Sequence, residues 1–177
     1  MKPHLVPWKE RYAPLIGRRI AALAWLPTPG DTPDLAAELD EPTLGFAGAA
    51  LIAFDEAGEL VLTPRPIDGG HGDGLAFVGL DTWPPYALDR VRASREPPWG
   101  LVEDARLTQV ELFTAPRVEL EQVVGARHLI VAGGRERFFW VATANGDRVR
   151  QGDRLWLGAG AEPPNLAQLQ LLTTIGR

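Results

Sequence analysis

The sequence predicts a mainly β protein, folded as a sandwich or a barrel-like structure with short helices. Apolar residues alternate with smaller ones along short segments, most clearly between Leu44 and Phe54. Turn residues such as Glu56–Gly58 separate these segments, as in β-hairpins. Apolar residues at helical spacing predict a short helix near the start of the chain, and the tail is a second candidate. A single α+β domain is the alternative fold class.

The first part of the chain begins with a predicted short helix. Pro7 suits its first position, and Trp8 and Tyr12 follow at helical spacing. Pro14 is expected to kink or break this helix, and Gly17 to end it. Beyond the helix, strands are expected over residues 18–26, 44–54, 60–63 and 75–80.

The second part is also rich in predicted strands. Residues 119–124 suit either a helix or a strand, and Asn145-Gly146 predicts a tight turn. The tail begins with Asn165 as a helix cap but continues into β-branched residues, so helix and strand compete there. The expected strands cover residues 107–113, 127–131, 137–143 and 154–157.

The order of these segments predicts two similar β-rich halves. Residues 1–83 form the first half, residues 84–100 a connection rich in proline and arginine, and residues 101–177 the second half. When the chain is displaced by 80 residues, Glu41 meets Glu121 and Glu56 meets Glu136, and further matches follow. These few identities predict an internal duplication, while one compact domain remains the alternative.

Composition restricts the setting and the partners. The formal net charge is −5 and there are no cysteines, so neither a basic nucleic-acid-binding face nor a disulfide framework is expected. No segment resembles a signal peptide or a membrane span. All basic residues except Lys2 and Lys9 are arginines, which is typical of a GC-rich bacterial genome. The sequence therefore predicts a bacterial cytoplasmic protein with no nucleic-acid or membrane partner.

Several common chemistries lack the residues that they require. Ser94 is the only serine and is not in a G-x-S-x-G elbow. Neither lysine follows a phosphate-binding loop, and no G-x-G-x-x-G motif follows a strand. The histidines, at positions 4, 71 and 128, lack the spacing of a metal site. No cofactor and no metal site are predicted.

One glycine-rich loop combines groups that can perform chemistry. Asp68 and Asp73 flank His71 among glycines, so the loop can bind a cation through oxygen ligands or serve general acid–base catalysis. The simpler interpretation is a surface turn, where Gly and Asp are favoured for backbone reasons. These three residues are the candidate ligand loop, and no catalytic residue is assigned.

The central segment provides a candidate interaction surface. Aromatic residues and arginines, which are enriched at binding hot spots, gather there beside prolines. The alternative is that the indoles cover the core and the arginines pair with acidic residues. The residues of this candidate surface are Trp83, Tyr86, Arg90, Arg92 and Trp99.

From these observations we expect a non-enzymatic binding or interaction protein. Its partner would be another protein or an anionic small molecule, and nothing in the sequence indicates an oligomeric state. The alternative is a small hydrolase or isomerase that uses the carboxylates and the histidine of the loop formed by Asp68, His71 and Asp73.

Overall fold

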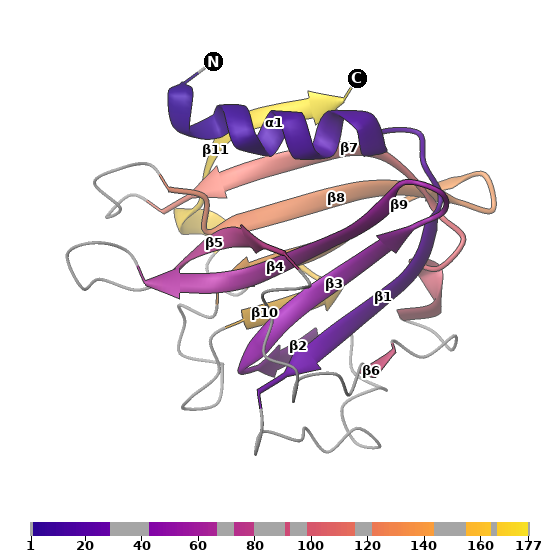
Figure 1. Ribbon diagram of the computed structural model, residues 1–177, viewed down its shortest axis with the longest axis horizontal. Helices are drawn as coiled ribbons and strands as arrows, with labels where there is room; N and C mark the ends of the chain where they lie inside the picture. The colour runs from indigo at the N-terminus through magenta and orange to yellow at the C-terminus, as the bar shows by residue number, and fades with distance from the viewer. Residues whose placement is uncertain are drawn as a thin grey trace.

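Two antiparallel β-sheets face each other, and a short N-terminal helix lies along one margin of the pair (Figure 1). This arrangement confirms the predicted mainly β fold of sandwich type with short helices. The computed structural model describes residues 2–28, 43–66, 73–79, 91–92, 99–115, 122–143, 155–163 and 166–176.

The N-terminal helix follows the predicted pattern. A 3₁₀ turn, η1 (Pro3–Leu5), leads into α1 (Val6–Tyr12), and η2 (Ala13–Leu15) continues it. Pro14 lies inside η2, where the α-helical hydrogen bonds stop, and Gly17 then takes a positive φ of 85°. The predicted break and end of the helix are therefore confirmed.

The first half of the chain supplies four strands of the five-stranded sheet, and β6 comes from residues 84–100. The order of this sheet is β5-β4-β3-β1-β6, and all neighbouring strands are antiparallel. The predicted hairpin turn joins β3 to β4. The strands are β1 (Ile20–Pro27), β3 (Gly48–Phe54), β4 (Gly58–Pro66), β5 (Asp73–Val78) and β6 (Val91–Arg92).

The six-stranded sheet comes mostly from the second half, and its order is β11-β7-β8-β9-β10-β2. The 3₁₀ turns η5 (Trp99–Leu101) and η6 (Leu166–Gln168) precede β7 and β11. In the tail, the β-branched residues thus form a strand after one short turn. The strands are β2 (Thr43–Phe46), β7 (Arg106–Thr114), β8 (Gly125–Ala132), β9 (Arg135–Thr143), β10 (Leu155–Ala159) and β11 (Gln170–Gly176).

At two corners the chain passes between the sheets, as in packed sheets whose strands bend from one into the other. Before β1, Arg19 forms a bridge with Arg106 of the six-stranded sheet. Between β2 and β3, the backbone bends at Ala47, and Gly48, the first residue of β3, has a φ of 153°. The prediction of one strand over residues 44–54 is therefore wrong: the segment is two strands in different sheets.

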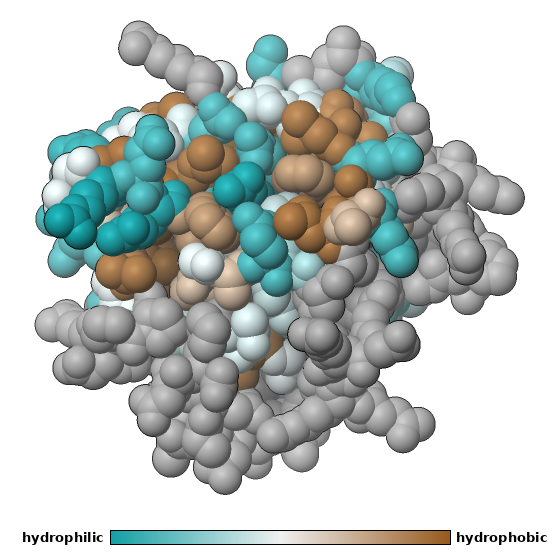
Figure 2. Space-filling model, turned by 180° about the vertical axis from the view of Figure 1, so that it is seen from behind, coloured by the Kyte–Doolittle hydropathy of each residue, from teal (hydrophilic) through white to brown (hydrophobic). Residues whose placement is uncertain are grey.

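The outer face of the six-stranded sheet carries a second group of aromatic residues. Trp140 and Trp156 are buried there. Phe113 is partly buried, and its ring centroid lies 4.8 Å from that of Trp140. Leu166 and Leu169, which follow β10 in the chain, pack against this group. On the face of the molecule that is turned away in Figure 1, hydrophobic residues form patches between hydrophilic ones (Figure 2).

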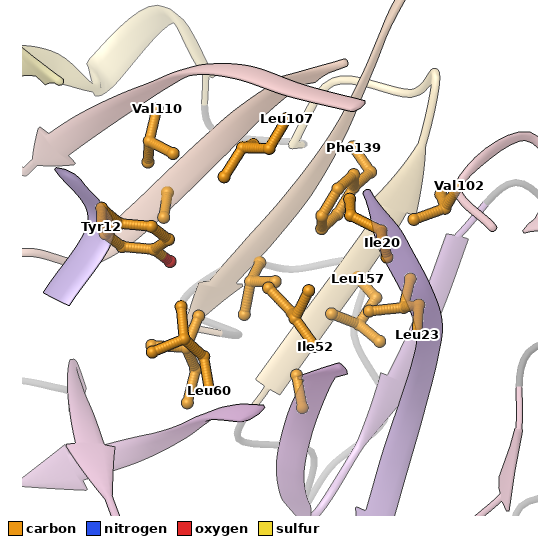
Figure 3. Close-up of a cluster of buried hydrophobic side chains, with 14 of the residues drawn as sticks. Tyr12, Ile20, Leu23, Ile52, Leu60, Val102, Leu107, Val110, Phe139 and Leu157 are labelled. Carbon is orange, nitrogen blue, oxygen red and sulfur yellow. The ribbon is translucent and has the colours of Figure 1, made fainter. Parts of the chain in front are cut away.

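One hydrophobic core lies between the sheets and contains residues from both halves (Figure 3). Leu23 and Ile52 reach it from the five-stranded sheet, and Leu107 and Phe139 from the other. Tyr12 of α1 completes the core at one side and is fully buried. The predicted halves therefore share their interior.

Each half contributes four antiparallel neighbouring strands, namely β1-β3-β4-β5 and β7-β8-β9-β10, although β2 of the other sheet intervenes in the chain between β1 and β3. The corresponding hairpin turns are Asp55–Ala57 and Gly133–Gly134. The predicted match of Glu56 with Glu136 therefore aligns a turn residue with a strand residue. The internal duplication and the division at residues 84–100 stay predictions.

Candidate ligand-binding groove

A groove of about 350 Å³ opens where the N-terminal helix meets the end of the β4–β5 hairpin. This volume falls in the range of small-molecule sites in proteins. Three parts of the chain line the groove: His4 and Trp8 from η1 and α1; Arg65, Pro66, Leu75 and Ala76 from β4 and β5; and Gln122 and Val123 before β8.

Backbone pairing places the second and third of these parts together. The N–H of Leu75 donates a hydrogen bond of 2.7 Å to the carbonyl of Val123, which fixes residues 122–124 against β5. Arg65 lies opposite Gly74 in the ladder between β4 and β5. Because Gly74 has no side chain, nothing from the paired residue competes with Arg65 for space.

The groove has a polar rim and an apolar floor. Trp8, Leu75 and Val123 are buried, whereas His4 and Arg65 are exposed. Arg65 has no ion-pair or hydrogen-bond partner among the residues that the structure describes. Within the described residues, the groove therefore offers an unpaired guanidinium beside buried apolar side chains, and none of the described lining residues is acidic.

Aromatic side chains hold the floor of the groove in place. Trp8 contacts Phe77 with 4.3 Å between ring centroids, and Tyr12 lies one helical turn further along α1. The Tyr12 hydroxyl and Nε2 of His128 share a buried hydrogen bond of 2.8 Å. The His128 ring also stacks on Phe139, with centroids 4.4 Å apart. This pair therefore joins the helix that carries Trp8 to the six-stranded sheet.

The Tyr12–His128 pair is neutral at physiological pH. Desolvation by burial lowers the pKa of His128 to about 3, and burial also raises the pKa of Tyr12. Among the described residues, Nδ1 of His128 has no hydrogen-bond partner. A buried imidazole without a carboxylate beside it favours its uncharged form.

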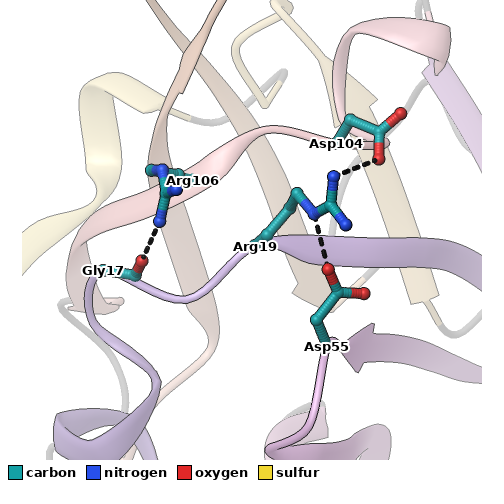
Figure 4. A network of polar contacts seen from close by, with 5 residues as sticks. All are labelled: Gly17, Arg19, Asp55, Asp104 and Arg106. Atoms are coloured by element: carbon teal, nitrogen blue, oxygen red, sulfur yellow. Dashed lines mark hydrogen bonds and ion pairs between the residues drawn. The ribbon is translucent and has the colours of Figure 1, made fainter.

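A second cavity, of about 300 Å³, lies at the corner where the chain passes from the six-stranded sheet into β1, and its described lining holds three arginines, Arg18, Arg19 and Arg106. Arg19 bonds to Asp55 through Nε and lies 3.6 Å from Asp104 (Figure 4). The hydrogen bond to Asp55, then the charges of Asp55 and Asp104, raise the pKa of Arg19. Arg106 donates to the carbonyl of Gly17 at 3.1 Å. This network ties two turns together, and the carboxylates of Asp55 and Glu56 offset part of the positive charge of the three arginines.

The candidate ligand loop is described only at its end. Asp73 is the first residue of β5 and lies opposite Pro66, a groove residue. Asp68 and His71 lie outside the described residues, so their convergence with Asp73 stays a prediction. The alternative enzymatic function that depends on this loop stays a prediction as well.

The candidate interaction surface is described at two of its five positions. The backbone of Arg92 in β6 pairs with Ala24 of β1. Trp99 is only 1% exposed and meets Trp25 edge to face, with centroids 6.2 Å apart. Trp99 therefore belongs to the core rather than to a surface. Removing its large apolar ring from water stabilises the fold. Trp83, Tyr86 and Arg90 lie outside the described residues.

Sequence reasoning did not select the residues that line the groove. In the sequence, Trp8 is marked only by its helical spacing with Tyr12, and His4 is a histidine without the spacing of a metal site. The one local signal for Arg65 is that it lies between Pro64 and Pro66. Prolines cannot donate backbone hydrogen bonds to a neighbouring strand, so they favour a position at the end or edge of a sheet. Gln122 joins the groove through contacts that no local pattern encodes.

Among the described residues, no three His, Asp or Glu side chains gather as metal ligands. In the same part of the chain, no helix has the length and apolar character needed to cross a membrane. Comparison with known proteins found no match to a protein-family model, a curated protein or a solved structure. Function is therefore inferred from the geometry and charge of the groove.

Proposed function

We propose that this chain is a binding protein of the bacterial cytoplasm that holds a small anionic molecule in the groove. The observation that carries this proposal is the unpaired Arg65 at the rim, above the buried Trp8 and Leu75. A ligand that has both an acidic group and an apolar part would bind Arg65 through the first and contact the apolar floor through the second.

The chemistry of the lining favours an anion. A guanidinium presents several N–H donors in a planar array and recognises carboxylates, sulfonates and phosphates. The side chains of His4 and Gln122 lie on the same lining and can add hydrogen bonds. Contact with the apolar floor removes water around the anion, which strengthens its attraction to Arg65.

Composition supports the proposed setting. Sixteen of the eighteen basic residues are arginines, which fits the codon usage of a GC-rich bacterium. The absence of cysteine fits a compartment where disulfides do not form. The base composition of the gene and fractionation of the native cells test these two points directly.

Binding of 1-anilinonaphthalene-8-sulfonate, an anion with an apolar ring system, tests the groove. We expect saturable fluorescence enhancement in the wild type and at least tenfold weaker binding to Arg65→Ala, about 1.4 kcal/mol. Arg137→Ala is the matched control, because Arg137 is an exposed arginine of β9 outside the groove lining. N-phenyl-1-naphthylamine, the neutral analogue, should bind the wild type and Arg65→Ala equally.

The outcome distinguishes the groove from general adhesion of the dye. If Arg65→Ala binds the sulfonate as tightly as the wild type, the proposed site is wrong. If Arg137→Ala weakens binding as much as Arg65→Ala, the attraction depends on total charge rather than on the groove. Near-ultraviolet circular dichroism of each variant checks that the side chains remain packed, since this dye also binds loosened proteins.

A further inference from the structure

The last strand, β11, forms one margin of the six-stranded sheet (Figure 1). It pairs with β7 on one side, and no described strand pairs with its other side. A strand at a sheet edge presents unpaired N–H and C=O groups that can accept another strand. With seven residues, β11 is long enough to form several hydrogen bonds with a partner strand.

The composition of β11 lacks the usual protection of an edge. Residues 170–176 contain no charged residue and no proline, two of the features that commonly prevent edge-to-edge pairing, and the strand is irregular only between Leu171 and Thr173, where its register with β7 shifts. Thr173, Thr174 and Ile175 are β-branched and suit an extended strand. The sequence of this strand therefore permits pairing instead of opposing it.

An exposed apolar side chain lies on the same strand. Leu171 is 55% exposed, the highest value among the large hydrophobic residues that the structure describes. It lies opposite Phe113 in the ladder with β7, and Phe113 belongs to the aromatic group around Trp140 on the outer face. An incoming strand would therefore meet both open backbone groups and apolar surface.

We infer that β11 pairs with β11 of a second copy of this chain, in antiparallel orientation about a twofold axis. Such pairing brings the exposed Leu171 of each copy toward the opposite end of its partner's strand, where Thr174 is exposed and Ile175 is buried in the core. The chain carries a net charge of −5, and an uncharged edge is a place where two copies approach with little repulsion.

A second copy fits this edge better than a charged peptide. No side chain of residues 170–176 offers a charge for such a peptide to pair with. The nearest charged residue on the neighbouring strand, Glu111, lies opposite Thr174 and already contacts Arg127 at 3.5 Å. Twofold pairing also closes on itself, because both open edges are used at once and no further copy can add.

Sedimentation equilibrium of the full chain at 5–200 µM tests the inference. We expect a mass that rises to twice that of one chain, and a dimer dissociation constant raised at least tenfold in Leu171→Lys. Val6→Lys is the matched control, because Val6 is the other exposed large hydrophobic residue in the described part of the chain and lies on α1. Its dissociation constant should equal that of the wild type.

Each alternative result overturns the inference. A wild type that stays a single chain at 200 µM excludes the dimer, and a Leu171→Lys variant that dimerises normally places the interface elsewhere. Equal loss in Val6→Lys would mean that added positive charge, not the edge, acts on association. If Leu171→Lys does not fold, Thr174→Lys replaces it, since Thr174 is also exposed on β11. Dye binding by Arg65→Ala is a separate readout, so either proposal can fail alone.

Discussion

At the end of the molecule where the groove lies, which we term the groove end, the N-terminal helix is anchored by the buried, neutral Tyr12–His128 pair. At the opposite corner, which we term the corner end, two turns are tied by the exposed charges of Arg19, Asp55 and Asp104. The first arrangement depends on excluding water and the second on opposite charges in water. They should therefore respond to different perturbations, acid for the groove end and salt for the corner end.

The largest expected effect is the response of the groove end to acid. The pKa of His128 is about 3 in the folded chain and 6.5 in the unfolded chain. Between these values the unfolded chain binds a proton that the folded chain excludes, so stability is complete above pH 6.5 and falls as the pH approaches 3. This linkage amounts to about 3 kcal/mol between pH 7 and pH 4.

Urea unfolding at pH 7 and pH 4 measures this effect. The loss of stability on acidification should be smaller in His128→Gln than in the wild type, by about the same 3 kcal/mol, since the carboxylates are common to both. Nuclear magnetic resonance of the imidazole gives a direct check in the wild type alone. A His128 ring that becomes charged near pH 6.5 in the folded protein would contradict its burial as a neutral group.

The next effect concerns the hydroxyl group of Tyr12. Tyr12→Phe leaves Nε2 of His128 buried without its partner, and an unsatisfied buried polar group costs about 1–3 kcal/mol. The double variant Tyr12→Phe/His128→Leu removes both polar groups and should recover part of this loss. Urea unfolding at pH 7 measures both, and a single variant as stable as the wild type would show that the bond does not anchor the helix.

Much of the groove end and the corner end was predictable at the level of elements, but not of contacts. The hairpin turn before Gly58 and the helix end at Gly17 follow from local backbone preferences that act within a few residues. Tyr12 and His128, however, are 116 positions apart, and no periodicity connects them. Each side chain was visible in the sequence, but their pairing depends on how the helix packs across two sheets.

The bend between β2 and β3 shows why a local pattern can mislead. Small residues continue on both sides of Gly48, so the alternation predicts one strand, whereas the backbone bends at Ala47 and passes into the other sheet. Likewise, Arg65 became a candidate only because Val123 pairs with Leu75 and brings residues 122–124 to the groove. Long-range backbone pairing of this kind determines the site, and the sequence encodes it only through the complete fold.

A smaller effect on the free energy of unfolding is expected from the backbone conformation of Glu56 at the corner end. Glu56 has a φ of 59° in the turn between β3 and β4, a conformation that costs most residues about 1–2 kcal/mol but not glycine. Glu56→Gly should therefore raise the free energy of unfolding by about 0.5 kcal/mol after the entropy cost of glycine. Glu136→Gly, in the regular strand β9, should lower it by roughly 0.5–1 kcal/mol. Equal losses in both variants would show that Glu56 is unstrained.

The smallest expected effect is a difference in salt-dependent stability between variants of Arg19, at the corner end, and Arg65, at the groove end. Arg19 is half exposed and paired with Asp55 and Asp104, so Arg19→Gln should lower the melting temperature slightly in low salt and have less effect in 0.5 M NaCl. Arg65 has no described partner, so Arg65→Gln should give no such salt-dependent loss of stability. A loss in Arg19→Gln that persists in high salt would mean that its packing, not its charge, joins the two turns. A salt-sensitive loss in Arg65→Gln would mean that this arginine is already neutralised within the protein, and the groove would then lack the free positive charge on which anion binding depends.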